Sequence, residues 1–270
     1  MEQSTAFQRR IAFSAADYWA RLDHLVVAFP APVRAAIDPA KIRVIPNGVP
    51  VPSAAAARLA PLPKGCDPEL VIGAACPIEP ESRIEFLIDM MAVLNERLAG
   101  VTLLLAGGVS ARHTDYWPRL LEHLRARKVG NVLFTGPHSD ASPHLRHARV
   151  FVTATDPAGS PMGILEAMAL GIPTVAPAGD GPGPVLDGIN GSLAEQENPR
   201  DMAHRVRCLL VNSATRRRLG ETAQLTAARD FSVGWMARRY AALFDPPSET
   251  VGRRLRATPV PRGQRTIPKI

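Results

Sequence analysis

The chain has 270 residues, and 46% of them are hydrophobic, which is enough to bury one substantial core. The basic excess behind its net charge of +7 is concentrated beyond Glu249, in a tail without aromatic residues or a base-reading motif, which argues against nucleic-acid binding. No apolar run approaches the roughly 20 residues of a membrane span, and the amino terminus has no signal-peptide pattern. Cys66, Cys76 and Cys208 lack metal-ligand spacing, so we expect reduced thiols in a cytoplasmic protein.

Two short apolar segments near the amino terminus, Leu25–Phe29 and Arg43–Ile45, predict strands that are joined by a short helix around Pro32–Ile37. The Pro-rich stretch Pro50–Pro68 follows them and indicates a domain boundary. A second boundary is predicted after Phe244, where the basic tail begins.

The rest of the chain alternates between strand and helix patterns. Strands are predicted at Glu69–Ala75, Val101–Ala106, Asn131–Thr135, Arg149–Thr155 and Ile172–Ala176. Apolar residues three and four positions apart predict helices around Phe86–Leu94, Trp117–Leu124 and Ser142–Arg146. A Gly- and Pro-rich loop, Gly179–Gly183, leads to a helical region from Pro199 to Leu243. This alternation predicts an α/β fold with a doubly wound parallel sheet.

The most informative segment is Val152–Ala176, which reads VTATDPAGSPMGILEAMALGIPTVA. A strand and a tight loop lead to Ser160–Pro161, which are typical of a helix start, and the helix continues through Met162–Leu170. Such a βαβ unit places the helix N-terminus at the carboxyl end of a strand, where its free N–H groups suit a phosphate. Glu166 lies one turn inside this helix.

This segment resembles the signature of the family 4 glycosyltransferases (glycosyl transferases group 1), which have the GT-B fold. The family pattern is commonly E-G-x-P-M-x-x-L-E-A-M-A-x-G-x-P-V-V-A, and the matching residues are Gly159, Pro161, Met162, Leu165, Glu166, Ala167, Met168, Ala169, Gly171, Pro173, Val175 and Ala176. The resemblance implies the Rossmann-like C-terminal domain of a GT-B enzyme, in which Glu166 holds the ribose hydroxyls of a nucleotide-sugar donor. Met162 and Gly163 then lie where the helix faces the donor diphosphate. The resemblance implies no metal or other cofactor.

Two further segments extend the resemblance. Arg43–Val49 resembles the hinge between the two Rossmann-like domains, and Phe231–Tyr240 resembles the closing helix that packs back across their interface. The resemblance divides the chain into a remnant of the N-terminal domain with the hinge (1–48), a donor-binding domain (49–245) and a basic tail that we expect to be disordered (246–270). Only about 45 residues precede the hinge, against the ~100–200 of a typical domain, so we expect self-association or a partner chain that supplies the missing half.

The sequence departs from the family where the donor diphosphate should be neutralised. Pro77 and Ser82 stand at the positions of the family's arginine and lysine. Arg83, next to the lysine position, could partly replace the lost charge, whereas Glu79 and Glu81 add negative charge. Preorganised charges contribute much of the catalysis in such sites, so these changes bear directly on activity.

Two functions therefore remain open. The first is a glycosyltransferase that binds a nucleotide-sugar and transfers the sugar to an unknown glycan or lipid-linked acceptor. The second is a catalytically degenerate binding or partner subunit, which Ala158 and Gly183 also favour because they stand where the family has glutamates. Each site residue also has a plainer interpretation, since Glu166 could be a surface residue favoured by the helix dipole and the helix start could serve packing alone. For the tail, we weigh simple solvation against contact with an anionic membrane, which would place the protein peripherally on the inner face.

Overall fold

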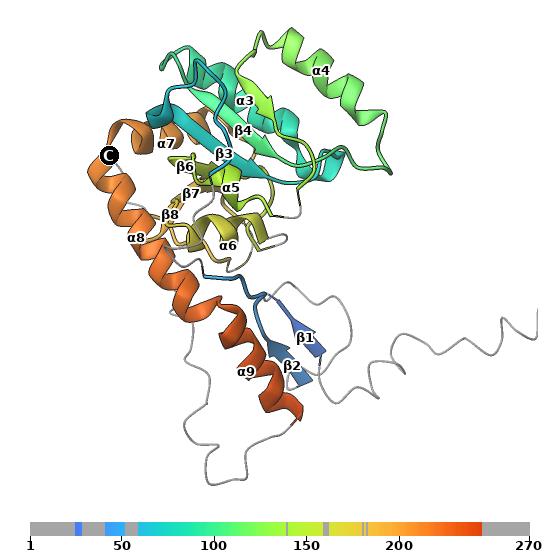
Figure 1. The fold of residues 1–270 in the computed structure, drawn as a ribbon, viewed down its shortest axis with the longest axis vertical. Helices are drawn as coiled ribbons and strands as arrows, with labels where there is room; N and C mark the ends of the chain where they lie inside the picture. The colour runs from blue at the N-terminus through green and yellow to red at the C-terminus, as the bar shows by residue number, and fades with distance from the viewer. Residues whose placement is uncertain are drawn as a thin grey trace, which may run out of the picture.

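The computed structural model describes residues 25–28, 41–51, 59–138, 140–158, 162–179, 181 and 183–244 (Figure 1). Three sequence predictions lie outside these residues: the helix around Pro32–Ile37, the helix start at Ser160–Pro161, and the tail from 246 to 270. None of the described helices is both long and apolar enough to cross a membrane.

A six-stranded parallel sheet forms the centre of the main domain (Figure 1). Its strands are β3 (Val71–Ala75), β4 (Thr102–Ala106), β5 (Val132–Phe134), β6 (Val150–Val152), β7 (Thr174–Pro177) and β8 (Gly191–Ala194). They lie in the order β5-β4-β3-β6-β7-β8, so the chain first adds strands on one side of β3 and then crosses back to the other side. This arrangement confirms the predicted doubly wound sheet, and it places a topological switch point between β3 and β6.

Helices cover both faces of the sheet. The described helices are α3 (Ile84–Asn95), α4 (Tyr116–Ala126), α5 (Ser142–Leu145), α6 (Met162–Ala169), α7 (Pro199–Val211), α8 (Ser213–Asp230) and α9 (Val233–Phe244), of which α9 lies away from the main sheet (Figure 1). Alternate residues of β6 point to opposite faces, as a strand requires. Val150 and Val152 pack in one core cluster with residues of α3 and α7, whereas Phe151 packs in the other with residues of α6 and α8.

The structure adds to the sequence prediction at two places. The stretch before Pro199 contains an additional strand, β8, which pairs with β7 at the edge of the sheet. Its sequence, GSLA, has no β-branched or aromatic residue, so the pairing partner and not local propensity decides its conformation. The predicted C-terminal helical region consists of three helices. The first break comes at Asn212, whose side chain accepts a hydrogen bond from the Thr215 N–H and caps the start of α8.

Most strands are also shorter than the patterns predict. Pro68–Leu70 is a turn of 3-10 helix, capped by the Asp67 side chain, so β3 begins only at Val71. Likewise β6 comprises only Val150–Val152 of the predicted strand Arg149–Thr155. The buried central residues of each strand agree with the prediction, because burial produces the pattern that the sequence reveals.

A separate two-stranded sheet lies at the amino end, where the two predicted strands are confirmed. Its strands β1 (Leu25–Val27) and β2 (Ile42–Val44) are parallel, and Leu25 pairs with Ile42. In Figure 1, α8 and α9 extend from the main sheet toward this small sheet. The segment that resembles the hinge thus begins in β2, and the helix that resembles the closing helix, α9, lies beside the small sheet (Figure 1).

The hinge is bonded to the start of α9 through the backbone of Val49, which is fully buried. The Val49 N–H donates to the Phe231 carbonyl at 2.8 Å, and the Val233 N–H donates to the Val49 carbonyl at 3.2 Å. A Cβ at Gly48 would lie 2.7 Å from the Val233 Cα, which is closer than real side chains approach. The backbones can pair in this way only because residue 48 is glycine.

We expect Gly48→Ala to separate the hinge from α9 and to destabilise the fold by about 1–3 kcal/mol, as overpacking does. Chemical denaturation measures the loss, and amide exchange of Val49 and Val233 locates it. Gly130→Ala is the matched control, because nothing lies within 4 Å of a Cβ at that position. Equal stability of the two variants would contradict this account of the hinge.

Candidate functional site

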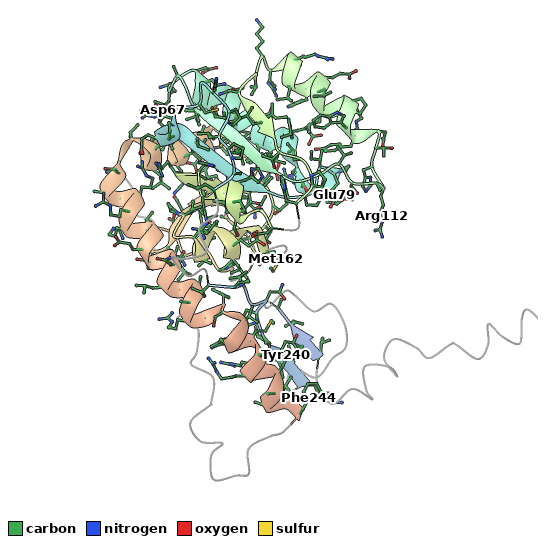
Figure 2. All side chains as sticks on the ribbon, viewed as in Figure 1. Asp67, Glu79, Arg112, Met162, Tyr240 and Phe244 are labelled. Carbon is green, nitrogen blue, oxygen red and sulfur yellow. The ribbon has the colours of Figure 1, made fainter. Side chains whose placement is uncertain are left out.

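A cavity of about 240 Å³ lies at the switch point, where the carboxyl ends of β3 and β6 diverge. Its lining comes from the loop after β3, from β6 and the loop that follows it, and from the first residues of α6. Ligands of doubly wound sheets bind at this position because the loops on the two sides leave a crevice. Figure 2 shows Met162, at the start of α6, on the side of the main domain that faces the two-stranded sheet.

The first turn of α6 reaches the cavity because Gly163 lies against the end of β3. A Cβ at Gly163 would lie 2.8 Å from the Ala75 carbonyl oxygen and 3.1 Å from the Phe151 ring. Met162, beside it, is 41% exposed and also lines the cavity. The geometry gives Gly163 a packing role, and this packing brings the positive end of a helix to the cavity wall.

Glu166 lies on the next turn of α6 and is partly buried. Its carboxylate has no hydrogen bond or ion pair to any described residue. Burial, and to a smaller extent the negative charge of Asp140, raises the pKa of Glu166. Asp140 remains charged because the Ser142 hydroxyl and N–H hold its pKa below the usual range. A buried carboxylate without a partner is costly to the fold, and such groups are typical of functional sites.

Arg83 does not line the cavity, although it lies in the same loop region. Its guanidinium forms an ion pair with Glu197 and lies 5.6 Å from the centre of the Phe86 ring. Of the four predicted donor-binding residues, Met162 and Gly163 thus line the cavity, whereas Glu166 and Arg83 lie outside its lining.

The cavity carries negative charge. No Lys or Arg is among its described lining residues, which include Glu79 and Glu81. Ser82 is buried, and its hydroxyl donates to the Pro77 carbonyl at 2.6 Å, so the lysine position of the family is closed off from the solvent. Burial raises the pKa of Cys76, another lining residue, to about 11, so its thiol stays protonated at neutral pH.

Sequence reasoning missed one cluster at the rim of the cavity. The ligand atoms of Glu79, Glu81 and His113 lie within 4.8 Å of one another, and among the described residues these could hold a cation. The Nε2 of His113 is 3.8 Å from the Glu81 carboxylate. Glu79 and Glu81 are visible in the sequence as an acidic pair, but His113 comes from the loop after β4, and only the fold brings it near.

The two positions where the family has glutamates lie close together. A Cβ at Gly183 would lie 3.2 Å from the Pro157 side chain and 3.3 Å from the Ala158 backbone nitrogen. Asp156 is turned into its own loop, since its carboxylate accepts a hydrogen bond from the Ala158 N–H at 2.8 Å. Small residues at 158 and 183 therefore allow the two loops to pack against each other.

The family model described as glycosyl transferases group 1 matches residues 69–212, more than half of the chain. No curated protein matches the chain. Among solved structures, TarM of S. aureus, in a complex that contains UDP, is 21% identical with a TM-score of 0.69, and the match covers 84% of this chain and 44% of TarM. HepE of Anabaena in complex with UDP is 20% identical with a TM-score of 0.70, over 83% of this chain and 64% of HepE.

A third structure that matches the chain is the C-terminal domain of the group 1 glycosyl transferase LpcC from Francisella tularensis. It is 19% identical with a TM-score of 0.56, and the match covers 69% of this chain and 100% of that domain. The chain thus spans less than two thirds of TarM and of UDP-bound HepE, but the whole length of a C-terminal domain. At these identities the likeness shows the fold.

The raised pKa of Glu166 makes the stability of the free protein depend on pH. The folded chain holds this proton more tightly than the unfolded chain, so the stability that the protonated carboxyl contributes at acid pH is lost as pH rises through the raised pKa. Glu166→Gln should therefore raise the Tm at about pH 7, with a smaller effect at about pH 4. Glu122→Gln, on the exposed side of α4, is the control and should leave the Tm unchanged. A Glu166→Gln variant that melts earlier at neutral pH would disprove the claim that this charge is unpartnered.

Proposed function

The chain belongs to the glycosyl transferases group 1 family, and from this membership we propose that its switch-point cavity binds a nucleotide-sugar donor whose sugar is transferred to an acceptor. The solved relatives bind UDP or UDP-glucose according to their descriptions, so uridine diphosphate sugars are the first donors to test. The acceptor in this proposal is a glycan or a lipid-linked saccharide. The donor is a substrate, and the proposal includes no resident cofactor.

The observation that carries the proposal is the unpartnered carboxylate of Glu166, which lies in the second turn of a helix whose first turn lines the cavity. Two hydroxyl groups of a ribose can each donate to one carboxylate oxygen. Such bonds stabilise the charged form of a carboxyl group, so they would offset the burial that raises its pKa. The proposal thus gives a function to a group that weakens the free protein.

The organisation of the chain limits this proposal to the donor half of the reaction. Residues 1–48 would be the remnant of an acceptor-binding domain with its hinge, and residues 49–245 the donor-binding domain. The described part of the first domain is the two-stranded sheet β1–β2. In this proposal a partner chain could add strands to the parallel sheet that β1 and β2 form.

A second candidate function is a binding or partner subunit that has lost catalysis. The observations that favour it are the negative lining of the cavity, with Glu79 and Glu81, and the tight packing of Gly183 against the Pro157–Ala158 loop. A glutamate at position 183 would need that loop to move. Binding of a nucleotide-sugar without turnover, in the presence of any partner chain, would distinguish this candidate from the first.

If Glu166 holds ribose hydroxyls, Glu166→Ala should weaken nucleotide-sugar binding by about 1.5–3 kcal/mol, the range for hydrogen bonds to a charged group. Calorimetry with UDP-, GDP- and ADP-sugars measures the effect, and circular dichroism checks that the variant is folded. Glu122→Gln again serves as the control. Equal affinities of the Glu166 variant and the parent chain would remove Glu166 from the donor site.

Because the lining is negative, removal of a carboxylate or addition of a cationic side chain in the loop after β3 should tighten the binding of a nucleoside diphosphate. Glu79→Gln and Pro77→Arg should each gain about 0.2–1 kcal/mol, the range for exposed charge pairs, and the gain should shrink as salt is added. We choose Pro77 because its side chain is exposed, whereas a lysine at the buried Ser82 would disturb the fold. Binding of the nucleoside without phosphates should not change. A gain for the nucleoside, or none for the diphosphate at low salt, would show that this loop does not face the phosphates.

A further inference from the structure

A second and larger cavity, of about 590 Å³, lies at the amino ends of the strands of the main sheet, and we propose that it binds the phosphate group of a small free anion. It is lined by residues that precede β3, β6 and β7, by the C-terminal end of α6 and by the first turn of α8. Because the strands are parallel, the residues that precede them lie together at their amino ends, whereas the switch-point cavity lies at their carboxyl ends. Figure 2 shows the two ends of β3, marked by Asp67 and Glu79.

Positive charge dominates the lining of this cavity. Four arginines contribute to it, from the segment before β6 and from α8: Arg146, Arg149, Arg216 and Arg217. Glu69 is the one acidic residue among its described lining residues. Two of the arginines share that carboxylate, with Arg149 donating to one oxygen at 2.6 Å and Arg216 to the other at 3.2 Å.

The other two arginines have no such partner. The guanidinium groups of Arg146 and Arg217 form no hydrogen bond or ion pair with any described residue. Arg216 is held in place by α7, because its guanidinium also donates to the carbonyls of Leu209 and Leu210 at the end of that helix. Burial lowers the pKa of Arg216, and the nearby charges of Arg149 and Arg217 lower it further, while Glu69 opposes them. The cations therefore repel one another, and a bound anion would relieve this repulsion.

Three features of the lining favour an anion, and the last of them favours phosphate over a carboxylate. Guanidinium groups match phosphate oxygens in geometry and can donate two hydrogen bonds at once. Ser213 opens α8, an 18-residue helix, so the positive end of that helix is part of the lining. The arginines outnumber the single carboxylate by three, which suits an anion with two or more charges better than a singly charged one.

The test uses the full chain, with inorganic phosphate and pyrophosphate as probes in calorimetric titrations. The double variant Arg146→Gln/Arg217→Gln should weaken pyrophosphate binding by about a hundredfold, or tenfold for each lost charged donor. These two side chains form no hydrogen bond or ion pair with a described residue, and Arg146 contributes only the smallest of the effects that lower the pKa of Asp140, so the variant should remain folded. Arg119→Gln, on the exposed side of α4, is the matched control and should change the affinity less than twofold.

Three results would overturn the proposal. In the first the parent chain fails to bind either probe at millimolar concentration, and in the second it binds pyrophosphate no more tightly than the double variant. A third is binding to phosphatidic acid vesicles through the same arginines without binding of soluble pyrophosphate, since that would make the ligand a membrane surface. The double variant should keep the part of nucleotide-sugar binding that Glu166→Ala weakens, because Glu166 lies outside this cavity. Failure of donor binding therefore leaves this proposal open to its own test.

Discussion

The position of the candidate site depends on the contact between the first turn of α6 and the carboxyl end of β3. The Gly163 backbone lies so near the Ala75 carbonyl that any side chain would collide with it at 2.8 Å. This contact fixes where α6 begins, and through the helix it fixes the partly buried carboxylate of Glu166. The fold thus supports a charge that costs stability in the free protein, a cost that a polar ligand could offset.

The sequence predicts the sheet well because its central strands are buried and their apolar runs report that burial. It also predicts the helix that carries Glu166, because the surrounding signature is long and specific. The failures have physical causes of their own. The edge strand β8 has no intrinsic strand preference and depends on β7. The ion pair of Arg83 with Glu197, a residue more than a hundred positions away, was not predicted either, and the donor-binding role of Arg83 stays a prediction. Neither interaction has a local signature.

The same limit explains why the charged clusters could not be predicted. Glu79 and Glu81 are neighbours in the sequence, but their grouping with His113 needs the loop after β4. Arg149 and Arg216 likewise meet at Glu69 only in the fold, since Glu69 lies in the turn before β3, Arg149 directly before β6 and Arg216 in α8. Single-residue departures from a family pattern were visible in the sequence, but their consequences follow from packing, as at Ala158 and Gly183.

The two cavities divide the charges of the main domain in an unusual way. The lining of the switch-point cavity includes Glu79 and Glu81, whereas four arginines line the cavity at the amino ends of the strands. Among the described residues, Glu166 has a carboxylate that could accept from ribose, although it lies outside the cavity lining, and no Lys or Arg lines the cavity to neutralise a diphosphate. Activity would require positive charge from elsewhere, such as a cation held by Glu79, Glu81 and His113, or basic residues of a partner chain. This requirement, more than the fold, decides between an enzyme and a binding subunit.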